Sequence, residues 1–399
     1  IFAPGFYSEP IKNELATDIL RITFPYLLFV SLVAFSGSIM NTYGKFSVPA
    51  LTPVFYNLTL VITAIWIAPL YEVPIYTIAW GMFVAGCIQL LIQVYPLLKL
   101  KLFPSFSFNL NHPGVRKVLF LMIPGVIAGG VSQLNMLVDT ILASFLPTGS
   151  PTWLYVSDRL MQLPLGIFAI AIGTVILPKL SSLHQNSDQE GFSKTMDWSL
   201  RLVMLIGIPS ILGLVLLSEP IILTLFERGE FLATDTTQAS YSLIALALGL
   251  VAFMLIKVLT PSFFARQDPK TPLKVALASM IINAFLAWLL AFYLGLNHVG
   301  LAMASSIAAY FSISILLFIL LKNKFYEVQK GWIGFFGRIV MASLLMTLIV
   351  HFMNIETFAW RELEQAERFL RLLLVIISAI AGYLAMLWIL GLRLAHLKG

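Results

Sequence analysis

The sequence predicts an all-α polytopic membrane protein with eleven transmembrane helices, and three observations support this fold class. Hydrophobic residues make up 59% of the chain and charged residues only 11%, whereas about a quarter of an ordinary soluble domain is charged. Apolar runs of roughly 20 residues, the length that a helix needs to cross a bilayer core, recur along the whole chain. The segments between them are alternately rich and poor in Lys and Arg, as are connections on the two sides of a membrane.

Each apolar run is taken as one span, in chain order. The spans lie near 19–43, 48–70, 73–98, 114–146, 154–179, 199–226, 238–265, 272–295, 298–321, 333–354 and 370–393. The basic connections hold most of the 25 Lys and Arg residues, and the positive-inside rule places them in the cytoplasm. The first residues then lie outside and the C-terminus inside. No basic tract or RNA-binding motif accompanies the net charge of +6, so no nucleic-acid partner is expected.

Two similar segments indicate an internal repeat. "NTYGKFSVPALTPVFYN" (41–57) and "FARQDPKTPLKVALASMIIN" (264–283) each contain a polar cytoplasmic turn, a proline where the next span begins and an asparagine farther along it. Six spans separate the two copies, so both halves point the same way, as in transporters built from two parallel bundles with the substrate site between them. The alternative is that Pro and Gly simply mark the start of any membrane helix.

The repeat divides the chain into two lobes and an addition. We expect residues 1–98 to be the remainder of an N-terminal lobe with three spans, and 99–113 to be a basic cytoplasmic linker that forms an interfacial helix. Residues 114–325 then form a C-terminal lobe with six spans, and 326–399 add two more. Because the visible N-terminal lobe is three spans short, we expect three spans to precede the first residue.

Ionisable residues within membrane spans are costly, and they usually face a cavity or a partner. They are Asp139, Asp158, Arg159 and Lys257. Asp139 shares a helix face with Ser132 and Asn135, because Asn135 follows Ser132 by three residues and Asp139 follows it by seven. Such a stripe either lines a cavity or forms a hydrogen-bond network between helices. On the first interpretation, Asn135 is a candidate substrate contact.

Asp158 and Arg159 are adjacent, so they point in different directions and each needs its own partner. Gln162 extends this polar patch by one turn. The alternative is that the pair anchors the span at the interface, since an arginine can snorkel. Lys257 lies between apolar residues, so it either loses its proton or needs an anion, which is an aspartate of the same lobe or the phosphate of a substrate.

The sequence does not resemble that of an enzyme. The five histidines show no metal-ligand spacing, and there is no Walker A, HExxH or CxxC pattern. The glycines of "GVIAGG" (125–130) fit helix packing within a span better than phosphate binding.

Three motifs in order, "APGF" (3–6), "SDRLMQLPLGIFAIAIGTVILPKLS" (157–181) and "KVLTPSFFARQDPKTPLKVA" (257–276), resemble the MurJ (MviN) family of bacterial lipid II flippases. The resemblance implies a fourteen-span protein of the bacterial inner membrane with two six-helix lobes and two further helices, and eleven spans fit this plan with the first three absent. It also implies that the protein moves lipid II, the undecaprenyl-pyrophosphate-linked peptidoglycan precursor, from the inner to the outer leaflet by alternating access.

The resemblance assigns roles to several residues. Asp158 and Arg159 match the family's Asp–Arg pair at the start of its eighth span, and Lys257 and Arg266 match basic positions in its tenth span and the turn after it. Gln162 stands where some members have an acid. These five and Asn135 are the candidate substrate-binding residues.

Some members resemble cation-coupled carriers, and the resemblance then implies that Asp139, Asn283 and Ser305 or Ser306 supply oxygen ligands to sodium. No second carboxylate accompanies Asn283. We expect no cofactor, and coupling to sodium or to the membrane potential. The implied partners are lipid II, membrane lipids and the cell-wall synthesis machinery, with the carrier acting as a monomer.

Three alternative functions stay open. A polysaccharide-lipid flippase or a multidrug extruder of the same superfamily would work by a similar mechanism, although extruders usually end at twelve spans. A membrane glycosyltransferase would carry catalytic carboxylates in a large external loop. Here the late external segment at 354–369 has the pattern of a short amphipathic helix instead.

Overall fold

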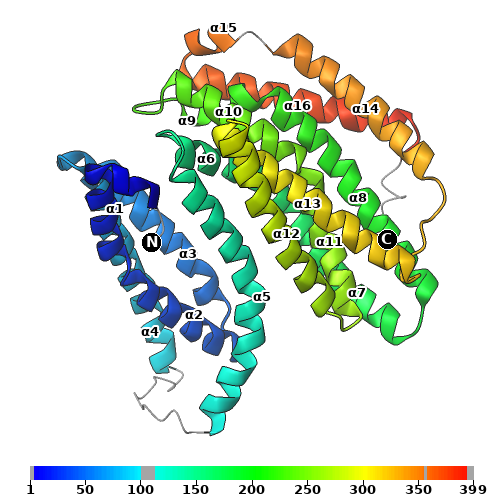
Figure 1. The fold of residues 1–399 in the computed structure, drawn as a ribbon, viewed down its shortest axis with the longest axis horizontal. Coiled ribbons are helices and arrows are strands. Elements are labelled where there is room, and N and C mark those ends of the chain that lie inside the picture. Colours follow the sequence, from blue (N-terminus) through cyan, green and yellow to red (C-terminus); the bar gives the residue numbers. More distant parts are fainter. Residues whose placement is uncertain (1–3, 100–112, 355–356, 393–399) are drawn as a thin grey trace. The chain divides into compact units, whose positions relative to one another are not determined.

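The computed structural model describes residues 4–99, 113–354 and 357–392, and these residues contain helices and connecting turns but no strands (Figure 1). They form two compact units. One comprises Phe6–Met122, and the other comprises Ile123–Gly399 together with Ile1–Gly5. The predicted interfacial helix in the linker 99–113 lies outside the described residues.

The unit Phe6–Met122 contains three membrane-length helical segments, two of which are broken. Its elements, after the 3₁₀ turn η1 (Pro4–Ser8), are α1 (Pro10–Thr23), α2 (Tyr26–Thr42), α3 (Ser47–Ile62), the π-helical η2 (Thr63–Ile67), η3 (Ala68–Leu70) and α4 (Pro74–Lys99). The expected start of the first span, residue 19, is wrong because the helix begins at Pro10. Proline suits the first helical position, where its missing N–H costs nothing. Hydropathy does not indicate this part of the helix, because α1 contains polar and charged residues.

The second unit holds the remaining elements. They are α5 (Pro113–Ala143, whose first turns belong to the other unit), α6 (Ser150–Pro164), π-helical η4 (Leu165–Ile170), α7 (Ala171–Gln185), α8 (Gln189–Leu216), α9 (Ser218–Phe226), α10 (Ala233–Leu248), α11 (Leu250–Ala265), α12 (Lys270–Trp288), π-helical η5 (Leu289–Tyr293), α13 (Asn297–Lys322), α14 (Trp332–Met353), α15 (Thr357–Glu362) and α16 (Gln365–Ile389).

The described residues contain nine helices that are long and apolar enough to cross a membrane, and the pair α10–α11, bent by 40° at Gly249, makes a tenth. The helix α5 occupies the place of the span expected at 114–146. Each predicted span therefore corresponds to a helix or to a broken helix. The chain is a multi-pass, all-α membrane protein, as predicted.

Two features of the second unit differ from the prediction. The span expected at 199–226 begins already at Gln189, and it ends at Leu216 before a separate helix α9. The side chain of Asp188 accepts a hydrogen bond from the N–H of Gly191 at 2.8 Å, which is a good helix start. The polar residues after it belong to the helix, and the expectation that they form part of a loop is wrong. A short helix within 354–369 is confirmed as α15.

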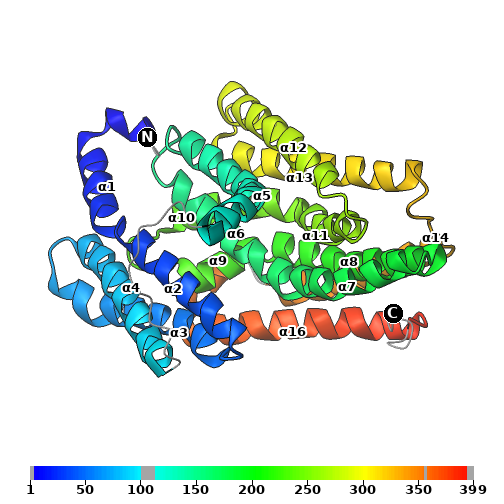
Figure 2. The ribbon, with the colours of Figure 1, turned by 90° about the horizontal axis from the view of Figure 1, so that it is seen from below.

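Helix pairs build the second unit. In Figure 2, α12 and α13 lie side by side on one edge of this unit and α16 lies on the opposite edge, with α8 and α11 between them. The last two long helices, α14 and α16, pack against each other, and α14 also packs along α8. A buried cluster that includes Leu205, Ile339, Met346, Val375 and Tyr383 fills the space between α8, α14 and α16.

Candidate functional site

The orientation of α6 is set by contacts with α10. The helix starts after Gly149, whose φ of 99° lies in the left-handed region that glycine adopts without strain. The indole N–H of Trp153 donates to Asp235 at 2.8 Å, and the hydroxyl of Ser157 donates to the carbonyl of Ala239 at 2.7 Å. One face of α6 is thereby fixed against α10, and Arg159 is exposed on another face.

Asp158 and Arg159 have separate partners, as their adjacency predicts. The amide nitrogen of Gln162 donates to the Asp158 carboxylate one turn away. The guanidinium carbon of Arg159 lies 4.9 Å from the centroid of the Tyr155 ring. This cation–π contact leaves the guanidinium donors free to bind an anion. The three predicted residues of α6 therefore form one patch, with a carboxylate held by an amide beside an exposed cation.

The predicted oxygen ligands converge on one buried amide. Asn283 of α12 is 1% exposed, and its side-chain nitrogen donates to Asn135 and to Asp139 of α5, both at 3.0 Å. Its oxygen accepts a hydrogen bond from Ser305 of α13 at 3.3 Å. Asn135 and Asp139 thus take part in a hydrogen-bond network between helices, the second interpretation of the α5 stripe, and this network holds the oxygens that a cation would use. Ser306 is bonded elsewhere, to the carbonyl of Ala245.

This network and the α6 patch are neighbours. Asp158 lies close enough to Asp139 for the two negative charges to repel each other. A hard cation binds carboxylate, amide and hydroxyl oxygens, so the same side chains suit sodium chemically. Among the described residues, no group of three His, Cys, Asp or Glu side chains could hold a metal ion, so a sodium site here would need amide and hydroxyl oxygens in addition to the Asp139 carboxylate.

Lys257 lies on α11 with its side chain exposed. No carboxylate in the described part of the chain forms an ion pair with it, so the expected aspartate partner in the same lobe is not found there. Its backbone carbonyl lacks a helical donor because residue 261, four positions later, is proline. Gly173 approaches this carbonyl so closely that a Cβ atom on it would lie 2.7 Å from the oxygen.

Arg266 does not join the α6 patch. It ends α11 with its guanidinium carbon 3.4 Å from the centroid of the Phe325 ring, beside a cavity of about 190 Å³ that is also lined by His184 and Asp188. Burial lowers the pKa of Arg266 relative to an exposed arginine. The geometry favours a role for Arg266 in packing the turn after α11 over direct contact with the α6 residues.

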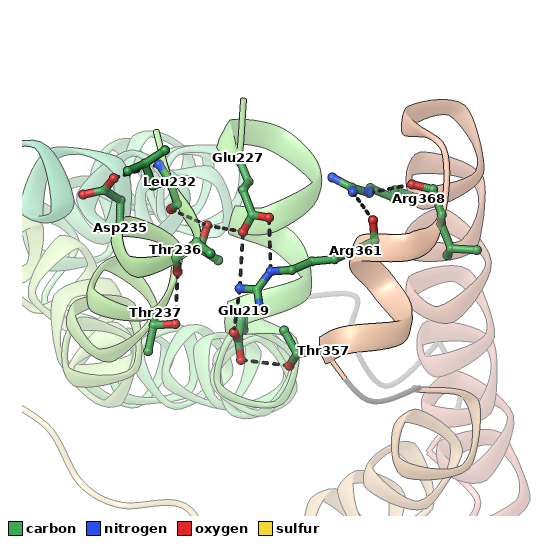
Figure 3. Close-up of polar contacts among 11 residues, drawn as sticks. Glu219, Glu227, Leu232, Asp235, Thr236, Thr237, Thr357, Arg361 and Arg368 are labelled. Atoms are coloured by element: carbon green, nitrogen blue, oxygen red, sulfur yellow. Dashed lines mark hydrogen bonds and ion pairs between the residues drawn. The ribbon is translucent and has the colours of Figure 1, made fainter. Parts of the chain in front are cut away.

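Sequence reasoning missed two clusters of charged residues. One surrounds Asp197 of α8, which is 4% exposed, and the other surrounds Arg361 of α15, which lies between Glu219 and Glu227 (Figure 3). The four-residue spacing of Asp197 and Arg201 is a signal that could have revealed the first cluster. The partners of the second are separated by more than a hundred residues, so no local pattern indicates it.

Comparison with known proteins identifies the family. The family model described as "Lipid II flippase MurJ" matches residues 1–384. The protein named "Probable lipid II flippase MurJ" from Vibrio cholerae serotype O1 is 44% identical over 97% of this chain and 73% of its own length. Its namesake from Haemophilus influenzae is 41% identical over 97% and 76%. The solved structure "Lipid II flippase MurJ, inward closed conformation" superposes with a TM-score of 0.76 at 29% identity, covering 93% of this chain and 73% of that one. The chain therefore belongs to the lipid II flippase MurJ family.

Proposed function

We propose that this protein moves lipid II from the inner to the outer leaflet of the bacterial inner membrane by alternating between inward-open and outward-open states. Membership of the lipid II flippase family supports lipid II as the substrate and its flipping as the activity. The reaction makes and breaks no covalent bond, so the protein acts as a carrier and not as an enzyme. The polysaccharide-lipid flippase, the multidrug extruder and the glycosyltransferase are not favoured by these relatives.

The exposed guanidinium of Arg159 is the observation that carries the proposal for the site. A pyrophosphate has several anionic oxygens, and the planar fork of an arginine binds two of them at once. The stacking on Tyr155 holds the arginine side chain while its donors stay available. Gln162 binds the Asp158 carboxylate, so Asp158 contributes an acceptor beside the cation without occupying its donors. Lys257 adds a second exposed cation on α11 of the same unit.

The Asn283 network supports coupling to sodium as part of the same proposal. An ion bound by oxygens of Asp139, Asn135, Asn283 and Ser305 would join α5, α12 and α13. Binding would require the Asn283 amide to present its oxygen in place of its nitrogen. Such an ion would also offset the repulsion between Asp139 and Asp158. The membrane potential is the alternative energy source. We further propose a monomeric carrier that works beside the cell-wall synthesis machinery.

Complementation tests the proposal. A bacterium whose own flippase can be depleted receives the full-length gene as wild type, Arg159→Ala, Arg159→Lys or Asp158→Ala. We expect the wild type to restore growth, the two alanine variants to fail and the lysine variant to restore it in part, because lysine keeps the charge but loses the fork. Lys194→Gln is the matched control, since it removes an exposed cation paired only within its own helix. A wild type that does not rescue, or alanine variants that rescue fully, would refute the proposal.

Sodium coupling has its own test. Transport by purified protein in vesicles should depend on a sodium gradient, and Asp139→Asn should abolish that dependence. Transport that is indifferent both to sodium and to Asp139→Asn removes the sodium part and leaves the flippase assignment intact.

A further inference from the structure

One face of α8 carries four polar side chains at four-residue spacing. They are Gln189, Ser193, Asp197 and Arg201. All four contact the connection between α13 and α14 or the start of α14. The Gln189 amide donates to the carbonyls of Lys324 and Phe325 at 2.9 and 2.8 Å, and the Ser193 hydroxyl accepts the N–H of Glu327 at 3.1 Å. Because residues four apart stack on one side of a helix, this row forms a continuous polar seat for the connection.

Asp197 is the centre of that seat. One carboxylate oxygen accepts hydrogen bonds from the Tyr326 hydroxyl and the Trp332 indole, both at 2.7 Å, and from the N–H of Gln329 at 3.2 Å. The other forms an ion pair with Arg201 at 2.6 Å. Burial and the nearby carboxylate raise the pKa of Tyr326 far above its ordinary value, so this phenol stays a donor. A buried carboxylate with this many partners fixes where α14 begins.

A second attachment lies in the middle part of α8. Residue 209 within α8 is a proline, so the carbonyl of Leu205 has no N–H to accept from four positions later. The hydroxyl of Tyr383 on α16 donates to that carbonyl at 2.7 Å, and both residues are buried. The proline thus creates an acceptor that α16 uses.

A third attachment lies at the opposite end of the bundle from Asp197. Arg361 of α15 reaches between two carboxylates, Glu227 at 3.2 Å and Glu219 at 3.6 Å, as Figure 3 shows. The hydroxyl of Thr357 also donates to Glu219, at 3.0 Å. Beside Arg361, the side chain of Trp360 is fully buried against α9 and α16. A helix of six residues is unstable alone, so these contacts hold α15 in place.

We infer that Asp197 and Glu227 are positioning residues that fix α14, α15 and α16, called here the C-terminal hairpin, to α8 and α9, so that the hairpin moves with the second unit as one body during transport. The attachments at Asp197, Leu205 and Glu227 are distributed over about 45 Å of helix along α8 and α9. A hairpin held at one end could swing, whereas one held at both ends and in the middle cannot move without breaking buried polar contacts.

This inference rests on the proposed function, because it states which parts move relative to each other while lipid II crosses. Its consequence is that the apolar outer faces of α14 and α16 keep one geometry relative to Arg159 on α6 in every state. A lipid bound both to Arg159 and to these outer faces would therefore find the same distance between its two contacts in every state.

Covalent fixation tests the inference directly. In full-length protein carrying Cys87→Ser, two cysteine pairs are introduced separately, Ser193→Cys with Glu327→Cys at one end and Glu219→Cys with Thr357→Cys at the other. The native contacts within each pair are short, so a short bifunctional maleimide can bridge the two sulfurs. Lipid II flipping in vesicles is measured before and after bridging. Single-cysteine variants treated with a monofunctional maleimide are the controls.

We expect the bridged proteins to flip lipid II at the rate of their unbridged forms. Loss of flipping on bridging, with the controls still active, would overturn the inference, because it would show that the hairpin must move away from α8 or α9. If the wild type itself does not flip lipid II, the proposed function fails and not the inference. The distance between spin labels at 193 and 327 then tests the inference. A fixed hairpin requires a single distance that lipid II and sodium leave unchanged. A second distance population would overturn the inference.

A rescue experiment separates positioning from general stability. Asp197→Asn keeps the shape of the side chain but puts amide hydrogens towards Arg201, so it should loosen the seat and lower flipping several-fold. Bridging positions 193 and 327 in the same protein should restore flipping. An Asp197→Asn variant that flips normally, or one that bridging does not restore, contradicts the positioning role.

Discussion

The hydrogen bond between Tyr383 and Leu205 gives the sharpest prediction for stability. Tyr383→Phe removes one hydroxyl from a site where the oxygen–oxygen distance is 2.7 Å and the two residues are 5% and 7% exposed. A hydrogen bond within a membrane contributes ~0.6 kcal/mol on average and up to ~1.7 kcal/mol. Here the loss also leaves a buried carbonyl without any donor, which costs about 1–3 kcal/mol. We therefore expect Tyr383→Phe to lower the free energy of unfolding by about 1–2 kcal/mol.

Pro209 makes this prediction specific. In a Pro209→Ala background, the new N–H at 209 can donate to the Leu205 carbonyl, so the carbonyl no longer depends on Tyr383. The same Tyr383→Phe change should then cost less than about 0.5 kcal/mol, which gives a coupling of about 1 kcal/mol between two residues on different helices. The effect of Pro209→Ala alone on the free energy of unfolding cancels in this double-mutant cycle.

The assay is reversible unfolding in mixed micelles, followed by tryptophan fluorescence as the fraction of denaturing detergent rises. All four proteins of the cycle are measured under the same conditions. Equal costs of Tyr383→Phe in the two backgrounds, within about 0.3 kcal/mol, would refute the reasoning that the proline creates the acceptor. A Tyr383→Phe protein as stable as wild type would show that the bond contributes nothing.

The remaining predictions concern three other places. Gly173→Ala places a Cβ 2.7 Å from the Lys257 carbonyl oxygen, so it should destabilise the protein by about 1–3 kcal/mol in the same assay, and a wild-type value would contradict that contact. Asn283→Ala removes three hydrogen bonds and should lower the free energy of unfolding by about 2–3 kcal/mol. It should also abolish any thermal stabilisation of the protein by sodium. Thr271 donates twice to Asp268 and lowers the pKa of that carboxyl. A depressed pKa means that stability is present above the unfolded value and is lost as pH falls through the folded value. Asp268→Asn should therefore destabilise at neutral pH and progressively less below about pH 4, whereas a pH-independent difference would argue against it.

The spans could be predicted because each requires about 20 apolar residues, and that requirement is local. Their breaks could not. A proline marks some of them, such as Pro25 between α1 and α2, but Leu217 between α8 and α9 has no such signal. The start of α8 at Gln189 was missed because hydropathy weighs polar residues against a membrane helix. The row from Gln189 to Arg201 is polar because it binds another part of the protein, not because it is a loop.

Part of the site could also be predicted from the sequence. Helix periodicity placed Asn135 and Asp139 on one face, and the structure places both against Asn283. Periodicity does not reveal which distant residue completes a cluster. Asp197 and Trp332 are 135 positions apart, and the exposed side chain of Lys257 could not be distinguished from a paired one. Such partnerships depend on tertiary packing, which a single sequence without related sequences does not contain.

Flipping of lipid II by the purified full-length protein tests the central claim most directly. The protein is reconstituted into vesicles that carry lipid II in the inner leaflet, and the lipid II that reaches the outer leaflet is measured with time. We predict protein-dependent movement that Arg159→Ala abolishes and Lys194→Gln leaves unchanged. Lipid II that stays in the inner leaflet with wild-type protein, or that moves equally fast with Arg159→Ala, would contradict the account.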